Sequence, residues 1–112
     1  MATYQWVINE LQTAPSEDGL TDVVKMVHWT RTAETYIDEE FLSVYTYGSM
    51  GCSTPSATDF TAYPDLTYDQ VCGWLNSGLD VVAIDLGLDQ KIENIINPPI
   101  VVLPLPFSNP TI

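Results

Sequence analysis

Basic side chains are scarce in this sequence. Lys25, Arg31 and Lys91 stand against fifteen acidic residues, which gives a formal net charge of −12. A protein that follows a nucleic-acid backbone needs clustered lysine or arginine to neutralise the phosphates. Binding to anionic membranes makes the same demand. We therefore predict that the chain binds neither nucleic acid nor membrane, and that its acidic surface keeps it soluble or docks on a basic protein.

The sequence also has no long hydrophobic run and few cysteines. No apolar stretch reaches the length of a membrane span, and the opening Met1–Trp6 lacks the charged and apolar regions of a signal peptide. We expect a protein made in the cytoplasm and not secreted by the usual route. Cys52 and Cys72 are too few for a disulfide scaffold and are expected to be buried free thiols, although one bridge stays open.

Groups that could carry out catalysis are equally sparse. The single histidine, His28, alternates with Val27 and Trp29 inside a predicted strand, which favours a core or face position. No Cys or His spacing suits zinc, and no glycine-rich loop with a lysine suggests a phosphate site. A thiol–imidazole pair of His28 with Cys52 is the catalytic alternative. We predict a non-enzyme without cofactor or metal.

The first half of the chain has the alternation of β-strands. Aromatic and β-branched residues at period two predict strands at Thr3–Leu11, Asp22–Arg31 and Phe41–Tyr47. Asp18-Gly19 suits a tight turn that needs positive φ, and Gly48–Pro55 is predicted to be a loop. The second strand is apolar on both faces, so it should lie in the centre of an antiparallel meander. One of those faces carries Val23, Val27 and Trp29, and the other carries Val24, Met26 and His28.

The chain changes to helical spacing after residue 66. Thr67 is a good N-cap, and Gln70 three residues later completes a capping-box pattern. Val71, Trp74 and Leu75 form the predicted buried stripe. Gly78 is predicted to end the helix in a left-handed conformation.

A second helix is predicted to begin at Asp80, the capping residue, and to bury a regular apolar stripe. Asp85, Asp89 and Glu93 follow at a spacing of four and are expected on the solvent side. Asp85 and Asp89 could hold a cation weakly, but they lack the ligand density of a calcium loop. Pro98 and Pro99 end the helix at residue 97. The fold class is therefore α+β, with a single domain over residues 1–97.

Residues 98–112 are predicted to form an extended, proline-rich apolar arm, because proline excludes helix and central strand there. Its six large apolar side chains are the predicted partner-binding residues: Ile100, Val101, Val102, Leu103, Leu105 and Phe107. Burying each stabilises by roughly 1.5–3 kcal/mol, on the order of 10 kcal/mol together. Such a segment is expected to pack either across its own domain or on a neighbouring subunit.

Nearly the whole chain resembles a family of small uncharacterised proteins encoded by tailed bacteriophages. The segments that carry the resemblance are Ser16–Val24, Val27-His28-Trp29, Val44-Tyr45 with Gly48, Phe60–Thr67, Gln70–Leu75, Asn97–Val101 and Leu103–Pro106. The acidic connection 34–40 departs from the pattern, since other members vary there.

The resemblance implies a virion or assembly protein, and it supplies no catalytic residues. We expect a capsid decoration (cement) protein that docks on shell subunits, with a tail or fibre component as the alternative. Its partners would be other phage structural proteins, or further copies in a small homo-oligomer. It would be made in the host cytoplasm and reside in the virion. A further alternative is a non-virion assembly chaperone or an acidic inhibitor of a host protein.

Overall fold

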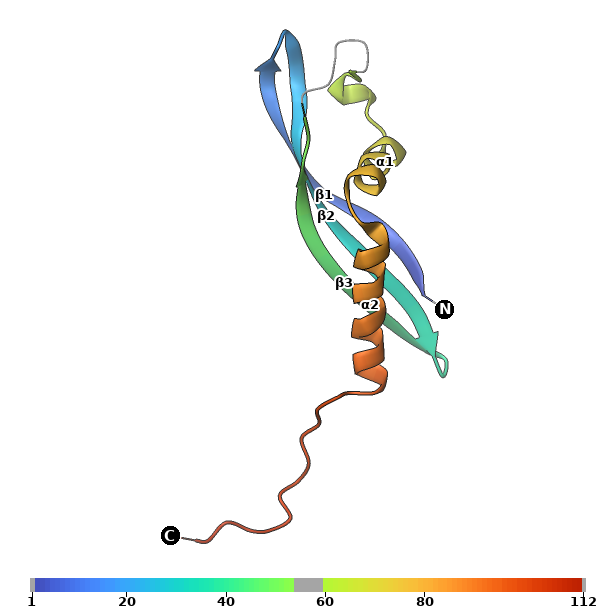
Figure 1. Cartoon of the computed structure of the whole chain (residues 1–112), viewed down its shortest axis with the longest axis vertical. Helices are drawn as coiled ribbons and strands as arrows, with labels where there is room; N and C mark the ends of the chain where they lie inside the picture. Colours follow the sequence, from blue (N-terminus) through green and yellow to red (C-terminus); the bar gives the residue numbers. More distant parts are fainter. Residues whose placement is uncertain (1, 54–59, 112) are drawn as a thin grey trace.

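The computed structural model describes residues 2–53 and 60–111 of the chain. A three-stranded antiparallel sheet in the order β1-β2-β3 is followed by two helices (Figure 1). The strands are β1 (Thr3–Glu17), β2 (Leu20–Ile37) and β3 (Glu40–Gly51). The predicted α+β class, the meander and the central position of the second strand are confirmed.

Two tight turns connect strands that are longer than the alternation predicted. Asp18 and Gly19 have φ of 51° and 81°, so the first turn is where the sequence predicted it. Asp38 and Glu39 form the second turn with φ of 50° and 71°. A paired strand-to-strand turn with positive φ at both central residues usually carries glycine or asparagine. The Asp38-Glu39 turn has neither, and the turn was not predicted from the sequence.

The predicted loop at 48–55 is wrong at its start. β3 continues through Gly48 to Gly51 and pairs with β2 over its whole length. Gly48 is typical of a turn in the sequence, but in the structure it pairs with Trp29. A Cβ at Gly48 would come within 2.8 Å of Trp29 Cζ2. The glycine thus makes room for an indole ring. Thr54 and Pro55, the end of the predicted loop, lie outside the described residues.

The helices begin as predicted, but the end of the first one differs. A 3₁₀ turn, η1 (Tyr63–Asp65), precedes α1 (Tyr68–Gly78) and α2 (Val81–Ile96). Thr67 Oγ1 accepts from Gln70 N at 3.2 Å, which confirms the N-cap. The side chain of Gln70 also reaches beyond the helix, since its Nε2 donates to Thr61 Oγ1 at 2.9 Å.

Gly78 is the last residue of α1 and does not adopt the predicted left-handed conformation; of the glycines described, Gly19 alone has positive φ. A Cβ at Gly78 would come within 2.5 Å of Met50 Sδ. The glycine therefore lets the end of α1 approach β3 closely. Asp80 caps α2 as predicted, since its Oδ1 accepts from Ala83 N at 3.1 Å.

Both helices cover the same face of the sheet and form two core clusters (Figure 1). The first joins the sheet to α1 and contains Trp6, Val24, Val27, Trp29, Val71, Cys72 and Leu75. The second joins it to α2 and contains Ala33, Val44, Leu88 and Ile92. A register shift between Ile8 and Glu10 brings both Ile8 and Leu11 against the first cluster despite their odd spacing. The predicted stripe is buried at Val71 and Leu75, with Trp74 half-buried beside it.

Neither helix in the described part of the chain is, taken singly, long and apolar enough to cross a membrane. The two pass that test of length and composition only as a pair, with a bend of 92° between them.

Candidate interaction surfaces

The arm leaves the end of α2 and extends away from the sheet (Figure 1). Residues 98–111 contain no helix or strand and are exposed along their whole length; Ile112 lies outside the described residues. The six predicted partner-binding side chains expose between 58% and 98% of their surface. Pro98 and Pro99 follow directly on the Asn97 C-cap of α2. The structure thus presents these side chains together on the arm, and none of residues 2–53 and 60–97 covers them.

The molecule exposes more surface than a compact protein of its size. A compact monomer of 12.4 kDa exposes about 6,100 Å², whereas this chain exposes 8087 Å². Its radius of gyration of 21.3 Å also exceeds the ~13 Å of a compact 100-residue domain. The excess of about 2,000 Å² matches the area that a specific protein–protein interface buries in total.

A second apolar surface lies on the side of the sheet that the helices leave uncovered. We call it the open face; it consists of Val7, Tyr36, Phe41, Tyr45 and Tyr47. These residues alternate with core residues such as Trp6 and Val44, so they point to the opposite side of the pleat. Their exposed fractions are 42%, 70%, 55%, 60% and 74%, in the order given.

The open face was not predicted from the sequence, although the period of two in β3 places Phe41, Tyr45 and Tyr47 on one side of the strand. What the alternation could not tell is which face the helices cover, because β3 is apolar on both sides. Tyr36 was assigned to a connection, yet it lies in β2 directly opposite Phe41, with ring centroids 5.4 Å apart.

Polar contacts hold α2 onto the sheet, and one of them corrects a prediction. Asp85 was expected on the solvent side but is half-buried, and it receives two hydrogen bonds from Arg31, at 3.0 Å from Nε and 3.2 Å from the second guanidinium nitrogen. The Arg31 guanidinium lies 4.6 Å from the ring centroid of Trp6. Asp89 and Glu93 are exposed as expected.

Asp89 accepts a hydrogen bond from the hydroxyl of Tyr4. This hydrogen bond, together with burial and the nearby negative charge, raises the pKa of Tyr4 to about 12. At the other edge of the sheet, Lys91 Nζ donates to the carbonyl oxygen of Tyr45 at 2.7 Å. Two of the three basic residues, Arg31 and Lys91, are therefore used to fix α2 to β-strands.

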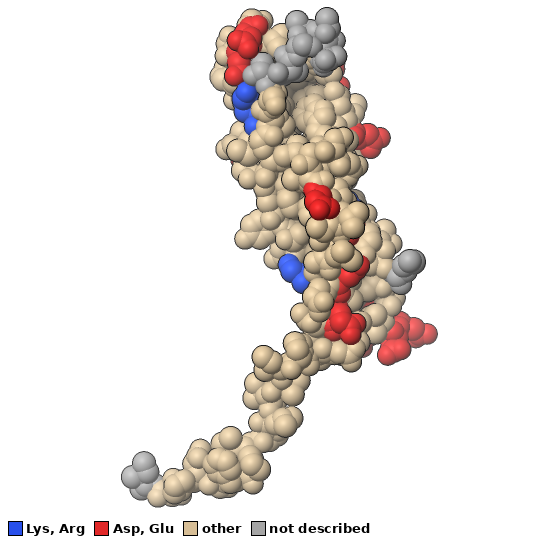
Figure 2. All heavy atoms as spheres, in the orientation of Figure 1, with Lys and Arg blue, Asp and Glu red and all other residues tan. Residues whose placement is uncertain are grey.

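The distribution of charge separates the body from the arm. Figure 2 shows acidic side chains scattered over the body and none on the arm. Residues 98–112 contain no Asp, Glu, Lys or Arg. The arm is thus an uncharged segment attached to an acidic body, and it can approach another acidic surface without charge repulsion.

A family model matches residues 1–107. The chain belongs to the DUF7936 family, a domain of unknown function. The match includes all the helices and strands and most of the arm, up to Phe107. Comparison with curated proteins and with solved structures gave no match.

The histidine and the two cysteines of this DUF7936 chain lie in its body, apart from the arm. His28 is on the face of the sheet away from the helices, with Nε2 3.6 Å from Glu10 Oε2. Cys52 and Cys72 are both free; Cys72 is buried and Cys52 half-buried, and burial raises the pKa of Cys52. Across residues 2–53 and 60–111, no three His, Cys, Asp or Glu side chains group closely enough to hold a metal ion.

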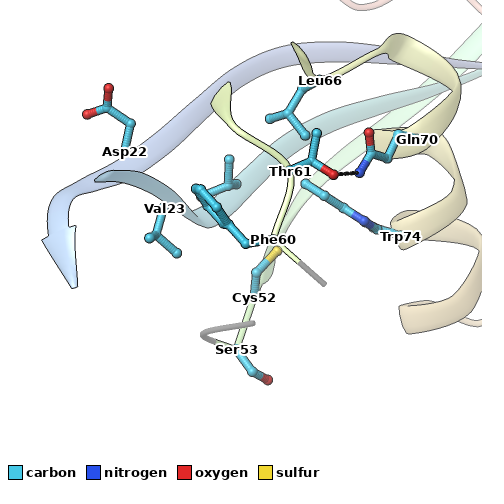
Figure 3. Close-up of a pocket in the computed structure, with 10 residues that line it drawn as sticks. Asp22, Val23, Cys52, Ser53, Phe60, Thr61, Leu66, Gln70 and Trp74 are labelled. Carbon is cyan, nitrogen blue, oxygen red and sulfur yellow. Dashed lines mark hydrogen bonds between the residues drawn. The ribbon is translucent and has the colours of Figure 1, made fainter. Parts of the chain in front are cut away.

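A cavity of about 340 Å³ lies between the start of β2, the end of β3 and α1 (Figure 3). Its lining is mainly apolar, with the Thr61–Gln70 hydrogen bond at one side. The lining residues are Asp22, Val23, Val24, Cys52, Ser53, Phe60, Thr61, Leu66, Gln70 and Trp74. The cavity has the size and the apolar lining to hold a small chemical group. The arm and the open face offer far more contact area.

Proposed function

We propose that this protein is a non-enzymatic structural subunit that joins a larger protein assembly through its C-terminal arm. The observation that carries the proposal is the exposure of six large apolar side chains on a segment that its own domain does not cover. Exposed apolar patches of this extent mark interaction sites in soluble proteins.

The energetics favour an arm that is covered when the protein is at work. Burying the six side chains contributes on the order of 10 kcal/mol. Ordering the backbone of each arm residue costs about 1–2 kcal/mol in a free chain. Five of the fifteen residues from 98 to 112 are proline, which restricts the unbound segment and lowers that cost. Proline in the arm therefore favours docking on a partner, whereas in water the six apolar side chains stay exposed.

The resemblance to tailed-phage proteins supplies the setting that we propose. The assembly is a phage virion, and the protein is a capsid decoration protein whose partners are the assembled shell subunits. A tail or fibre position is the second candidate. The charge distribution supports either: with a net charge of −12 on the body, neighbouring copies repel one another, so attachment falls to the uncharged arm.

Quantitative mass spectrometry of purified particles tests this proposal. Host cells express either the wild-type chain or a variant with Leu103→Ser and Leu105→Ser. These cells are then infected with a phage that lacks the native gene. The matched control is Val82→Ser, which removes an equally exposed apolar side chain (72% exposed) from α2. We expect the wild type and V82S in the particles and the arm variant absent, although its circular dichroism is unchanged.

Copy number then separates the two virion positions. Many copies per particle indicate decoration, and a few to a dozen indicate the tail. Absence of the wild-type protein from particles would contradict the virion assignment. Full incorporation of the arm variant would contradict the role of the arm.

A further inference from the structure

We propose that the open face of the sheet is a binding site for the proline-rich arm of a second copy of this chain. The inference deepens the proposed function, since it rests on the arm being a protein-binding element, and it names a receiving surface. Both surfaces belong to the same chain, and each is uncovered in the structure. Reciprocal exchange of arms between two copies would cover both in one symmetric dimer.

The chemistry of the arm decides how it binds. Proline has no backbone N–H and cannot donate to a β-ladder, so a segment with prolines at 98, 99, 104 and 106 is a poor fourth strand. Such segments form polyproline II structure and bind surfaces lined with aromatic rings. The open face provides four rings, three of them tyrosines. Proline rings pack on aromatic faces, and tyrosine hydroxyls donate to the unpaired carbonyls of the arm.

A polyproline II arm is long enough to follow the row of rings. Along β3, Phe41 and Tyr47 are separated by roughly 20 Å, at 3.4 Å per residue. Along a polyproline II arm, Pro99 and Pro106 are separated by about 22 Å, at 3.1 Å per residue. The proline-rich part of the arm therefore spans the whole row of three rings.

The apolar residues between the prolines have a place beside this row. Val7 and Tyr47 flank Thr30, because the pairing places Val7 and Tyr47 opposite Thr30 from its two sides. The open face thus has aromatic rings on β3 and a smaller apolar side chain on β1, with Thr30 of β2 between them. Leu103 and Leu105, which alternate with the prolines, would lie along it.

Charge selects the arm over the body as the contacting element. Two bodies with a net charge of −12 each repel one another. The arm has no charged side chain, so its docking brings an uncharged segment, and not a second acidic surface, onto the sheet. The arm also emerges from α2, on the covered side of the sheet (Figure 1). The open face of its own chain is on the opposite side.

The area is sufficient for a stable dimer. Each chain exposes about 2,000 Å² beyond a compact monomer of the same mass. Covering half of that excess on each of two copies would bury about 2,000 Å² in total, at the upper end of the standard range for specific interfaces.

Mass measurement in solution on full-length chains tests the proposal. Sedimentation equilibrium of the wild type over a wide concentration range is expected to give a monomer–dimer equilibrium. A face variant, Tyr45→Ser with Tyr47→Ser, and the arm variant, Leu103→Ser with Leu105→Ser, should each weaken dimerisation by roughly tenfold or more. Phe41→Ser, at the other end of the row, should weaken it independently. Tyr63→Ser and V82S, exposed positions outside both surfaces, should dimerise as the wild type does.

Mixing the two variants provides the decisive result. The face variant keeps an intact arm, and the arm variant keeps an intact face. An equimolar mixture should therefore form heterodimers through one arm–face contact, more strongly than either variant dimerises alone. A wild type that stays monomeric at every concentration would overturn the proposal, whether its arm is free or docks on its own face. A face variant that dimerises like the wild type would also overturn it.

The same variants keep this inference separate from the proposed function. If the face variant enters particles normally and dimerises normally while the arm variant does neither, the arm binds elsewhere and only the receiving surface proposed in this subsection is wrong. If the dimer behaves as expected but the chain is absent from particles, the virion proposal is wrong and the arm–face contact stands.

Discussion

Replacing Gly48 by alanine should destabilise the fold, although the same substitution is harmless or stabilising at most other glycines of this chain. Gly48 does not have a positive φ, so its backbone conformation is open to alanine. The obstacle is steric. The new Cβ would lie 2.8, 3.2 and 3.3 Å from three atoms of the Trp29 ring, and the closest approach is about 0.7 Å shorter than an ordinary carbon–carbon contact.

Trp29 has little freedom to move away. Its side chain is buried, and its ring packs edge-to-face on Trp6 with centroids 5.4 Å apart and planes at 86°. Forcing extra volume into such a core costs typically about 1–3 kcal/mol. Alanine restricts the unfolded chain relative to glycine and returns about 0.4–1 kcal/mol. The net loss for Gly48→Ala is therefore about 1–2 kcal/mol, or a decrease in Tm of roughly 5–10 °C.

Urea unfolding followed by far-UV circular dichroism measures this loss. Two matched controls carry the same substitution. At Gly51, in the same strand, the nearest atom to a new Cβ is the Lys25 carbonyl oxygen at 4.0 Å, so Gly51→Ala should be neutral or slightly stabilising. At Gly73, inside α1, nothing lies within 4 Å, and alanine should stabilise by about 1 kcal/mol. A Gly48→Ala protein as stable as Gly51→Ala would refute the steric reasoning.

Two further outcomes follow from the contacts that hold α2. Asp85→Ala should lower the free energy of unfolding by about 2–4 kcal/mol, because it leaves the largely buried Arg31 guanidinium without its carboxylate; urea titration measures the loss. Glu93→Ala, an exposed position on the same helix, should change it by no more than about 0.5 kcal/mol, and an equal loss in both would contradict the reading of Asp85. The hydrogen bond to Asp89 raises the pKa of Tyr4 to about 12 from an ordinary value of 10.0. The folded state therefore keeps the Tyr4 proton that the unfolded state loses, so this stabilisation is complete below pH 10 and is lost as the pH rises to about 12. Tyr4→Phe should show a weaker decline in stability over that window, and identical pH profiles would refute the assignment.

The sequence was sufficient for the elements whose signals are local. The caps at Thr67 and Asp80 and the Asp18-Gly19 turn each depend on a few neighbouring residues, and all three are where they were predicted. The antiparallel order followed because short connections join alternating segments. Propensity over a short window was enough for these features.

Features that depend on contacts between distant residues could not be predicted from local propensity. Gly48 and Gly78 look like turn and cap residues, but each is small because another side chain, Trp29 or Met50, lies against it. Asp85 has the spacing of a solvent-facing residue, and only its pairing with Arg31, 54 positions away, turns it toward the sheet. The uncovered aromatic face could not be predicted for the same reason, since periodicity fixes which residues share a face and leaves open which face is packed.

The extended outline of the chain has a consequence for how copies are counted. A radius of gyration of 21.3 Å is that of a compact protein of roughly 400 residues, three to four times the length of this chain. A separation by molecular size would place one extended copy where a compact trimer or tetramer belongs. The proposed arm exchange would double the mass while drawing both arms onto the sheets, so size alone would not tell a dimer from an extended monomer. Methods that weigh the particle distinguish them, and a ratio of size to mass that falls with rising concentration is the physical signature of arms that have found their partners.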